Sequence, residues 1–354
     1  MKKNIDEAGI TRAIACLAVV MVHISAIPVA TLQPNSIHMI FFSLLNRGLK
    51  FTTPTFIFLS GLTLFYSYKD RSFNYYSFLK KRLSTTIIPY LIWSFIYYRY
   101  FIYEGYYIFS WSFLFENLLL ANMSYHLYFI LTIIQFYLLF GIFLYVFKKF
   151  SPLAVLMVLC SISIFTLRYI HIPYGDRFFM RYVFFFGLGC YTAIYIDIIR
   201  EKLLQYKLFF IAAYIGATSY YGYQFYQYYG LKKPVNVFLV ELTWFGFAIT
   251  AIFFYFLLSN YIVKSSNQWI YKGLKKITAC SYYVYLSHPL VLFLSEKFLT
   301  NRGVISITGR FVLNVLIVYG GTLPLAILYS SMKDRLKEYN RRRRAKEVTL
   351  HSRV

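Results

Sequence analysis

Residues 126–147 read HLYFILTIIQFYLLFGIFLYVF, an uninterrupted stretch without a single Asp, Glu, Lys or Arg. A helix that crosses the hydrocarbon core of a bilayer needs roughly 20 mainly apolar residues, and this stretch meets that length. It therefore predicts a membrane-spanning helix rather than a core segment of a water-soluble domain.

The same pattern recurs along the 354 residues, of which 59% are hydrophobic and only 14% charged, against roughly 25% charged in soluble domains. We predict an all-α, polytopic integral membrane protein with about ten transmembrane helices. A single transmembrane domain would occupy 1–332, followed by a basic cytoplasmic tail at 333–354. The expected helices are 9–31, 48–68, 83–103, 126–147, 151–169, 179–198, 208–226, 236–259, 277–297 and 310–332.

The charges are unequal, with 37 Lys+Arg against 13 Asp+Glu and a formal net charge of +24. Cytoplasmic loops of membrane proteins carry an excess of Lys and Arg. With the N-terminus inside, 26 of the 37 cations fall on the inner side and nine on the outer side, while Arg47 and Lys50 are ambiguous at the entrance to the second predicted helix. This distribution predicts an N-in, C-in topology. The Arg run at 341–344 then suits an anchor to anionic lipid, and without a basic face on a folded soluble domain we expect no nucleic-acid partner.

The four cysteines fall within predicted spans and form no Cys-x-x-Cys pair. We interpret them as small packing residues and expect no metal site. They are Cys16, Cys160, Cys190 and Cys280.

Polar residues inside membrane helices are costly and usually face a cavity or a partner. Arg12 and His23 are 11 residues apart, which is close to three helical turns, so both lie on one helix face about 16 Å apart. We expect Arg12 at the cytoplasmic end and His23 at depth, with both facing the same cleft. Arg12 alone could be a topological anchor and His23 an interhelical hydrogen bonder. A deep imidazole is also the side chain best suited to accept a proton near neutral pH.

Three further residues lie near the inner ends of the next two predicted helices. Ser60 precedes a glycine, a pair typical of close helix contacts that also leaves room for a ligand. Lys81 and Arg82 stand at the start of the third span. Topology alone explains such cations, but they also suit recognition of phosphate groups.

Two more histidines belong to polar runs. His126 and Tyr128 begin the fourth span, where an aromatic interfacial belt is the simpler interpretation. His288 lies deep in the ninth span, and the following Pro289 removes a backbone donor there. Membrane helices tolerate such a proline best beside a polar cavity.

Two additional charges are predicted to lie within spans. Arg181 falls in the sixth span and Glu241 in the eighth. Charged groups at membrane depth need partners, so these two are candidate counter-charges, although nothing in the sequence pairs them.

Together, the order and spacing of these motifs resemble acyltransferase family 3 over residues 9 to about 332. The two most specific elements are Arg12-x10-His23 and Ser281-Tyr-x-x-Tyr285-Leu-x-His288-Pro289. The other elements are Phe-x-Phe-Leu-Ser60-Gly61, Lys81-Arg82 with Pro89-Tyr90, His126-Leu-Tyr128-Phe129 and Phe184-Phe-Phe-Gly187.

The resemblance implies a bacterial plasma-membrane enzyme that moves an acetyl or similar small acyl group, succinyl included, from cytosolic acyl-coenzyme A to a hydroxyl of a cell-envelope or extracellular polysaccharide. Acyl-coenzyme A would be a donor substrate, with no permanently bound cofactor. The implied partners are the glycan acceptor, the bilayer and a glycan synthase complex. The implied roles are catalytic for His23 and His288, donor-binding for Arg12, Lys81 and Arg82, and pocket-forming for Ser60, His126, Tyr128, Arg181 and Glu241.

The chain departs from the family pattern at two positions. Thr85 stands where many members have a second Arg, and Tyr128 stands where many have Trp. Length and Tyr/Phe richness look closest to the subset that includes the intercellular adhesion protein C of poly-N-acetylglucosamine biofilm operons. A polysaccharide exporter or flippase is the alternative function, because ten spans with intramembrane polar residues also suit a glycan conduit.

Overall fold

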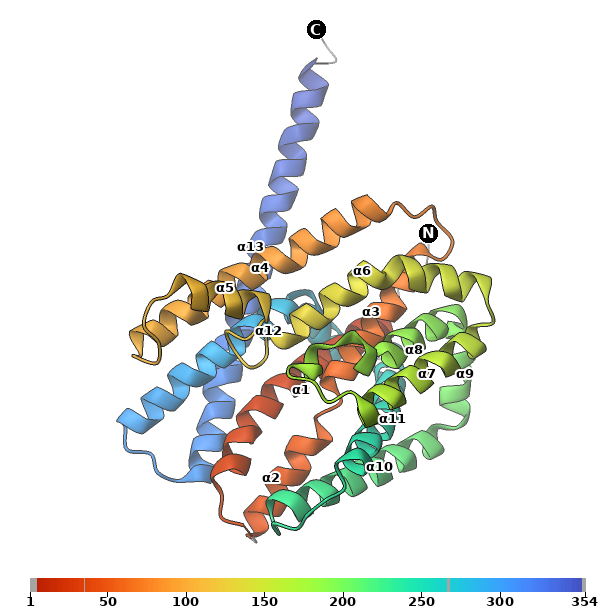
Figure 1. Cartoon of the computed structure of the whole chain (residues 1–354). Coiled ribbons are helices and arrows are strands. Elements are labelled where there is room, and N and C mark those ends of the chain that lie inside the picture. The colour runs from red at the N-terminus through yellow and green to blue at the C-terminus, as the bar shows by residue number, and fades with distance from the viewer. Residues whose placement is uncertain (1–4, 35, 266–267, 352–354) are drawn as a thin grey trace.

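The computed structural model describes residues 5–34, 36–265 and 268–351, and within these ranges it contains helices and no strand. All ten predicted segments coincide with helices, which confirms the all-α class (Figure 1). The helices are α1 Asp6–Thr31, α2 Ile37–Gly48, α3 Thr52–Tyr68, α4 Tyr75–Tyr103, α5 Trp111–Leu119, α6 Tyr128–Lys149, α7 Pro152–Tyr169, α8 Val183–Ile194, α9 Ile196–Gln205, α10 Lys207–Tyr229, α11 Val237–Lys264, α12 Gln268–Asn301 and α13 Ile307–His351, with 3-10 turns at Gly175–Arg177 and Phe179–Arg181.

The chain is a multi-pass membrane protein by the length and hydropathy of its helices. Among the described residues, six helices are long and apolar enough to cross a bilayer: α1, α6, α7, α11, α12 and α13. The pair α8 and α9, bent by 96°, raises the number to seven if it forms one broken span. The remaining predicted spans are the 17-residue α3 and the tyrosine-rich helices α4 and α10.

Helix α1 occupies the centre of the bundle, where it contacts α2, α3, α11, α12 and α13. Small side chains at Ala8, Ala13, Ala15 and Ala18 are buried and allow these neighbours to approach closely. This central position exposes α1 to every cavity formed by the surrounding helices.

Helices α3 and α8 pack together at two glycines. A Cβ atom at Gly61 would lie 2.1 Å from the backbone oxygen of Phe186, and one at Gly189 would lie 2.1 Å from that of Phe58. The small-residue helix contact suggested by Ser60-Gly61 is therefore present, with α8 as its partner.

Three local features differ from the predicted segments. Helix α2 precedes the second predicted span and begins at Ser36, whose side chain accepts a hydrogen bond from the Met39 amide. The region between α4 and α6 contains the short helix α5. The predicted helix at 179–198 breaks at Tyr195, between α8 and α9, and Arg200 of α9 forms an ion pair with Glu7 of α1 at an Nη2–Oε2 distance of 2.9 Å.

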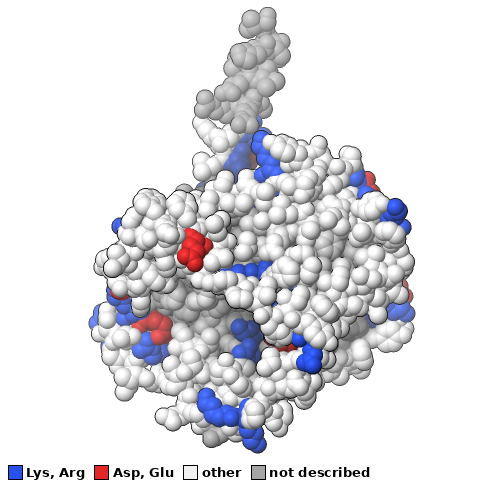
Figure 2. Space-filling model, viewed as in Figure 1, with Lys and Arg blue, Asp and Glu red and all other residues white. Residues whose placement is uncertain are grey.

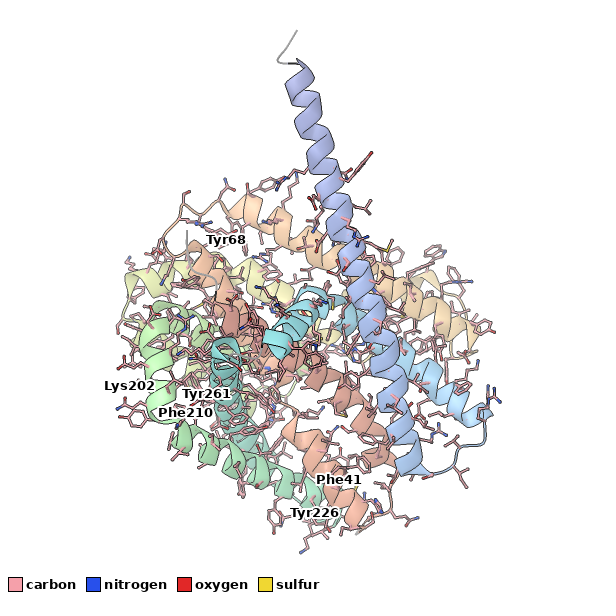
Figure 3. The ribbon with its side chains drawn as sticks, turned by 180° about the vertical axis from the view of Figure 1, so that it is seen from behind. Phe41, Tyr68, Lys202, Phe210, Tyr226 and Tyr261 are labelled. Carbon is pink, nitrogen blue, oxygen red and sulfur yellow. The ribbon has the colours of Figure 1, made fainter. Side chains whose placement is uncertain are left out.

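The outer surface is suited to lipid. Large apolar side chains such as Phe41 and Ile305 are 57% and 92% exposed, and most of the face in Figure 2 carries uncharged residues. Figure 3 shows Phe41 at the periphery and α13 running along the bundle before its C-terminal part extends beyond it. Apolar exposure on this scale is expected of a lipid-facing surface.

Candidate functional site

Two cavities lie among the helices around α1. The larger, about 990 Å³, opens beside the start of α1 and is here called the basic cavity because five cations line it. They are Arg12, Arg71, Arg82, Lys275 and Lys333. The only acid lining it among the described residues is Asp6.

The smaller cavity, about 340 Å³, is here called the histidine cavity. His23 and His126 line it together with Lys50, Tyr128 and Trp244. Its remaining lining residues are Val19, Val22, Thr52, Thr53, Phe56, Tyr125, Phe129, Tyr182 and Tyr285.

Three aromatic side chains line both cavities: Phe56 from α3, Phe129 from α6 and Tyr285 from α12. The ring centroids of Phe56 and Phe129 are 5.8 Å apart, as are those of Phe129 and Tyr285. We call these three residues the aromatic constriction. They stand between the cation-lined and histidine-lined spaces, so a flexible chain reaching from one space to the other passes them.

Helix α1 contributes one predicted residue to each cavity. Arg12 lines the basic cavity and His23 lines the histidine cavity. The 11-residue spacing aligns both side chains along α1, but they face two adjoining cavities rather than the single cleft that the sequence suggested.

The three predicted histidines converge from α1, the α5–α6 connection and α12. The His23 ring centroid lies 5.2 Å from that of His288, and the His126 centroid lies 5.5 Å from that of His288. His288 is fully buried, with Nδ1 3.0 Å from the Val284 carbonyl oxygen. Its Nε2 has no hydrogen-bond partner in the described part of the chain. His23 makes ring contacts and, in the described ranges, no side-chain hydrogen bond, which leaves its nitrogens available to a substrate.

His126 is held by its own neighbours. Its Nδ1 lies 3.2 Å from the Ser124 hydroxyl, and its backbone carbonyl accepts a hydrogen bond from the Tyr285 hydroxyl. Tyr128, where many family members have Trp, places its hydroxyl 3.1 Å from the Thr53 hydroxyl. The aromatic change thus keeps a large ring at the cavity and adds a hydrogen bond to α3.

Tyr97 of α4 contacts the backbone of α12 beside Pro289. Its hydroxyl donates to the Leu286 carbonyl at 2.8 Å and accepts from the Leu290 amide at 3.2 Å. Because residues 286 and 290 are one helical turn apart, the tyrosine hydroxyl connects two backbone groups of the turn that carries His288. Nothing in the sequence indicated this role, because Tyr97 is one of many tyrosines in α4.

The basic cavity includes some predicted cations and not others. Arg82 lines it, and the buried Nε of Arg82 has no hydrogen-bond partner within the described residues. Lys81 is exposed and is not a lining residue. Arg71, Lys275 and Lys333 join the cavity from elements far apart in sequence, and only their positions just outside the predicted spans could have suggested them.

Ser60 also lines the basic cavity, and its hydroxyl donates to the Phe56 carbonyl at 2.9 Å. This bond within α3 leaves Ser60 as a small polar wall residue next to the aromatic constriction. The small side chain of Ser60 keeps this face of α3 open to the cavity, while Gly61 faces α8.

Arg181 and Glu241 form an ion pair with each other, from the 3-10 turn before α8 and from α11. The Arg181 guanidinium carbon also lies 5.2 Å from the centre of the Trp244 ring. Neither charged residue lines a cavity, although Trp244 and Tyr182 beside them line the histidine cavity. The structure therefore supplies the pairing that the sequence left open and places it behind the cavity wall.

Among the described residues, no group of three or more His, Cys, Asp or Glu side chains could hold a metal ion. The four cysteines are unpaired. The polar side chains that line the two cavities carry imidazole, hydroxyl, ammonium and guanidinium groups, together with the carboxylate of Asp6.

The central helix α1 of this membrane protein therefore contributes to both a cation-lined cavity and a histidine-lined cavity. The acyltransferase domain family model, Acyl_transf_3, matches residues 5–331, and the chain belongs to this family. No curated protein and no solved structure matches it significantly.

Family membership makes the chain a membrane-bound acyltransferase. It has an acyl donor and an acceptor as substrates and the bilayer as its surroundings. The family model describes an acyltransferase domain, which supports an enzyme over the alternative of a polysaccharide exporter or flippase.

Proposed function

We propose that the protein transfers an acetyl or succinyl group from cytosolic acyl-coenzyme A to a hydroxyl of a cell-envelope or extracellular polysaccharide. The observation that carries this proposal is the arrangement along α1, with Arg12 in the basic cavity and His23 in the adjoining histidine cavity. A donor with an anionic head and a long flexible thioester arm fits two spaces joined in this way.

The phosphates of coenzyme A would lie among the cations of the basic cavity. Guanidinium groups suit phosphate because they present paired donors, and Arg82 has an unpartnered buried Nε there. Lys275 and Lys333 supply further charge from α12 and α13. The arm would then pass the aromatic constriction toward His23.

In the simplest chemistry, His23 takes the proton from the acceptor hydroxyl while that oxygen bonds to the thioester carbonyl carbon. The carbon–sulfur bond breaks, and the coenzyme A thiolate receives the proton that His23 holds. A transient acyl-imidazole on His23 is the alternative route. In its first step a ring nitrogen bonds to the carbonyl carbon, the carbon–sulfur bond breaks, and coenzyme A leaves as the thiol with the imidazole proton. In its second step the acceptor oxygen bonds to that carbon, the carbon–nitrogen bond breaks, and the hydroxyl proton returns to His23. His288 stacks on His23 and would orient its ring in both routes.

This function agrees with an orientation in which both chain ends face the cytosol. The basic cavity would then open to the cytosolic pool of donor, while the histidine cavity would lie toward the acceptor outside. The proposed enzyme crosses a bacterial plasma membrane ten times, with α3, α4 and α10 among the crossings. Residues 1–332 would form the enzyme domain and 333–354 a basic tail. A poly-N-acetylglucosamine-type glycan, with its synthase complex as partner, is the acceptor system we favour.

The test is replacement of the proposed base. The His23→Gln variant should express and fold, yet lower acyl transfer by about 10²–10⁴-fold, because general base catalysis contributes on that order. Mass spectrometry of envelope glycans, together with release of free coenzyme A by purified protein, measures the loss. The control is His38→Gln, which changes a histidine in α2 that lines neither cavity. Full glycan acylation in the His23→Gln variant would refute the assignment.

A further inference from the structure

The cationic side chain of Lys50 lines the histidine cavity. No step of the proposed acyl transfer requires this side chain. It lies in the connection between α2 and α3, at the end of the protein opposite the cations of the basic cavity. Within the described residues, its ammonium has no ion-pair partner and no hydrogen bond. No acidic side chain lines the histidine cavity.

The backbone on both sides of Lys50 is fixed. Its amide donates to the Arg47 carbonyl at 3.1 Å, and its carbonyl accepts from the Trp244 indole of α11 at 3.3 Å. The next residue, Phe51, is fully buried, with its ring 4.2 Å from that of Tyr255. These contacts fix the backbone from which the Lys50 side chain reaches the cavity wall.

Nearby charges are already neutralised or directed elsewhere. Arg181 pairs with Glu241 behind the wall. The Arg47 guanidinium carbon lies 3.5 Å from the centre of the Phe225 ring, away from the cavity lining. The Lys50 ammonium is thus the cation that the histidine cavity presents to whatever enters it, and a partly buried lone cation favours an anionic partner.

We propose that Lys50 is a specificity-determining residue that binds an anionic group, a carboxylate in the first instance, on the substrate held beside His23. The carboxylate has two possible sources. It is either the free end of a dicarboxylic acyl group on the donor or an acidic group on the acceptor glycan. This inference rests on the proposed function, because it names the chemistry of the substrate at the same site.

The cavity's other polar groups complement this role. Tyr125, Tyr128 and Tyr182 offer neutral hydroxyl groups, and His23 and His126 face the same space. Burial, followed by the charge of Arg47, lowers the pKa of Lys50 to about 8. The ammonium is therefore mostly charged at neutral pH, and anion binding through it should decline as the pH rises past 8.

The first experiment measures binding and needs no turnover. Purified protein in nanodiscs is titrated with monomethyl succinate and neutral dimethyl succinate, and with the methyl glycosides of glucuronic acid and glucose. The fluorescence of Trp244, which lines the cavity, reports binding. The Trp244→Phe variant gives the signal of the other tryptophans, which is subtracted. We expect one anionic probe to bind at least tenfold more tightly than its neutral counterpart, and Lys50→Gln to remove that preference. The probe that shows the preference identifies the donor or the acceptor as its source.

Two further variants separate charge from structure. Lys50→Arg keeps the cation and should retain the preference at pH 9, where the preference of the wild-type protein should fall. The matched control Lys233→Gln removes an exposed lysine outside both cavities and should change nothing. Equal affinity of Lys50→Gln and wild type for both anionic probes would overturn the proposal.

The second experiment compares turnover of succinyl- and acetyl-coenzyme A with neutral and uronate-containing oligosaccharides. Lys50→Gln should lower kcat/KM about tenfold for substrate pairs that bring the anion and less than twofold for neutral pairs. An equal loss for all pairs would show a merely structural role. Absence of transfer by the wild-type protein would count against the proposed function, while the binding preference would still decide the role of Lys50.

Discussion

Adjacent cations at the start of α4 have different surroundings in the folded chain. Arg82 lines the basic cavity, whereas Lys81, its neighbour in sequence, is exposed. The pair therefore offers an internal comparison of a donor-binding residue with a topological charge.

Arg82→Gln should raise the KM for acyl-coenzyme A by roughly tenfold or more, because a hydrogen bond to a charged group contributes about 1.5–3 kcal/mol. The change should leave kcat nearly constant if Arg82 binds the donor head equally in the ground and transition states. Steady-state kinetics of coenzyme A release measures both constants. Lys81→Gln is the control and should change KM by less than twofold. Equal effects of the two substitutions would contradict the assignment of Arg82.

Tyr97 supports a second prediction at the residue scale. Tyr97→Phe should leave the Leu286 carbonyl and the Leu290 amide without their bridge, at a cost of about 1–3 kcal/mol in stability. Because His288 lies in the turn that Tyr97 contacts, activity should fall as well. Thermal unfolding and kcat are the measurements, with Tyr100→Phe as the control because no hydrogen bond of the Tyr100 hydroxyl occurs in the described ranges. An unchanged melting temperature and kcat would exclude the bridging role.

At the scale of elements, the contact between α3 and α8 leaves no room for a side chain at Gly61. Gly61→Ala should force the two helices apart, since the new Cβ would meet the Phe186 backbone oxygen. Overpacking of this kind costs typically about 1–3 kcal/mol, and more where backbone must move. Thermal unfolding in detergent measures the effect.

The matched control for that substitution is Gly246→Ala in α11, where nothing lies within 4 Å of the added atom. Alanine there should stabilise the helix by up to about 1 kcal/mol. Changes of opposite sign in the free energy of unfolding would confirm that the close contact between α3 and α8, rather than the glycine residue as such, determines the effect. The same sign for both would contradict it.

The aromatic constriction joins α3, α6 and α12. Phe56 and Phe129 pack against both large hydrophobic clusters of the protein, so the constriction lies where the two cores meet. Phe129→Trp should narrow the passage between the two cavities and reduce the rate of acyl transfer. Binding of coenzyme A in the basic cavity should persist. Comparing kcat with the Kd for coenzyme A distinguishes these effects. Loss of coenzyme A binding would place the donor differently.

At the scale of the whole molecule, the charge distribution predicts its orientation. A reporter that is active only in the cytosol should be active when fused after residue 332 and inactive when inserted at 230–236. The physical reason is the excess of Lys and Arg at one end of the bundle, which favours retention on the cytoplasmic side. Activity at both positions would contradict the N-in, C-in orientation with an even number of spans.

The sequence by itself determined the class of the protein, because the length and apolarity of each span are local properties that do not depend on neighbouring segments. The order of the motifs along the chain also indicated the family. The placement of Arg12 and His23 on one helix face followed from helical geometry alone.

Only the tertiary structure decided which polar groups meet. It divided the expected single cleft into two cavities, left Lys81 outside, paired Arg181 with Glu241, and brought Lys50 and Tyr97 to the site. These partners are separated by tens to hundreds of residues, and their meeting depends on how helices pack around α1. The 3.6-residue repeat fixes the faces of one helix but contains no information on which helix lies opposite.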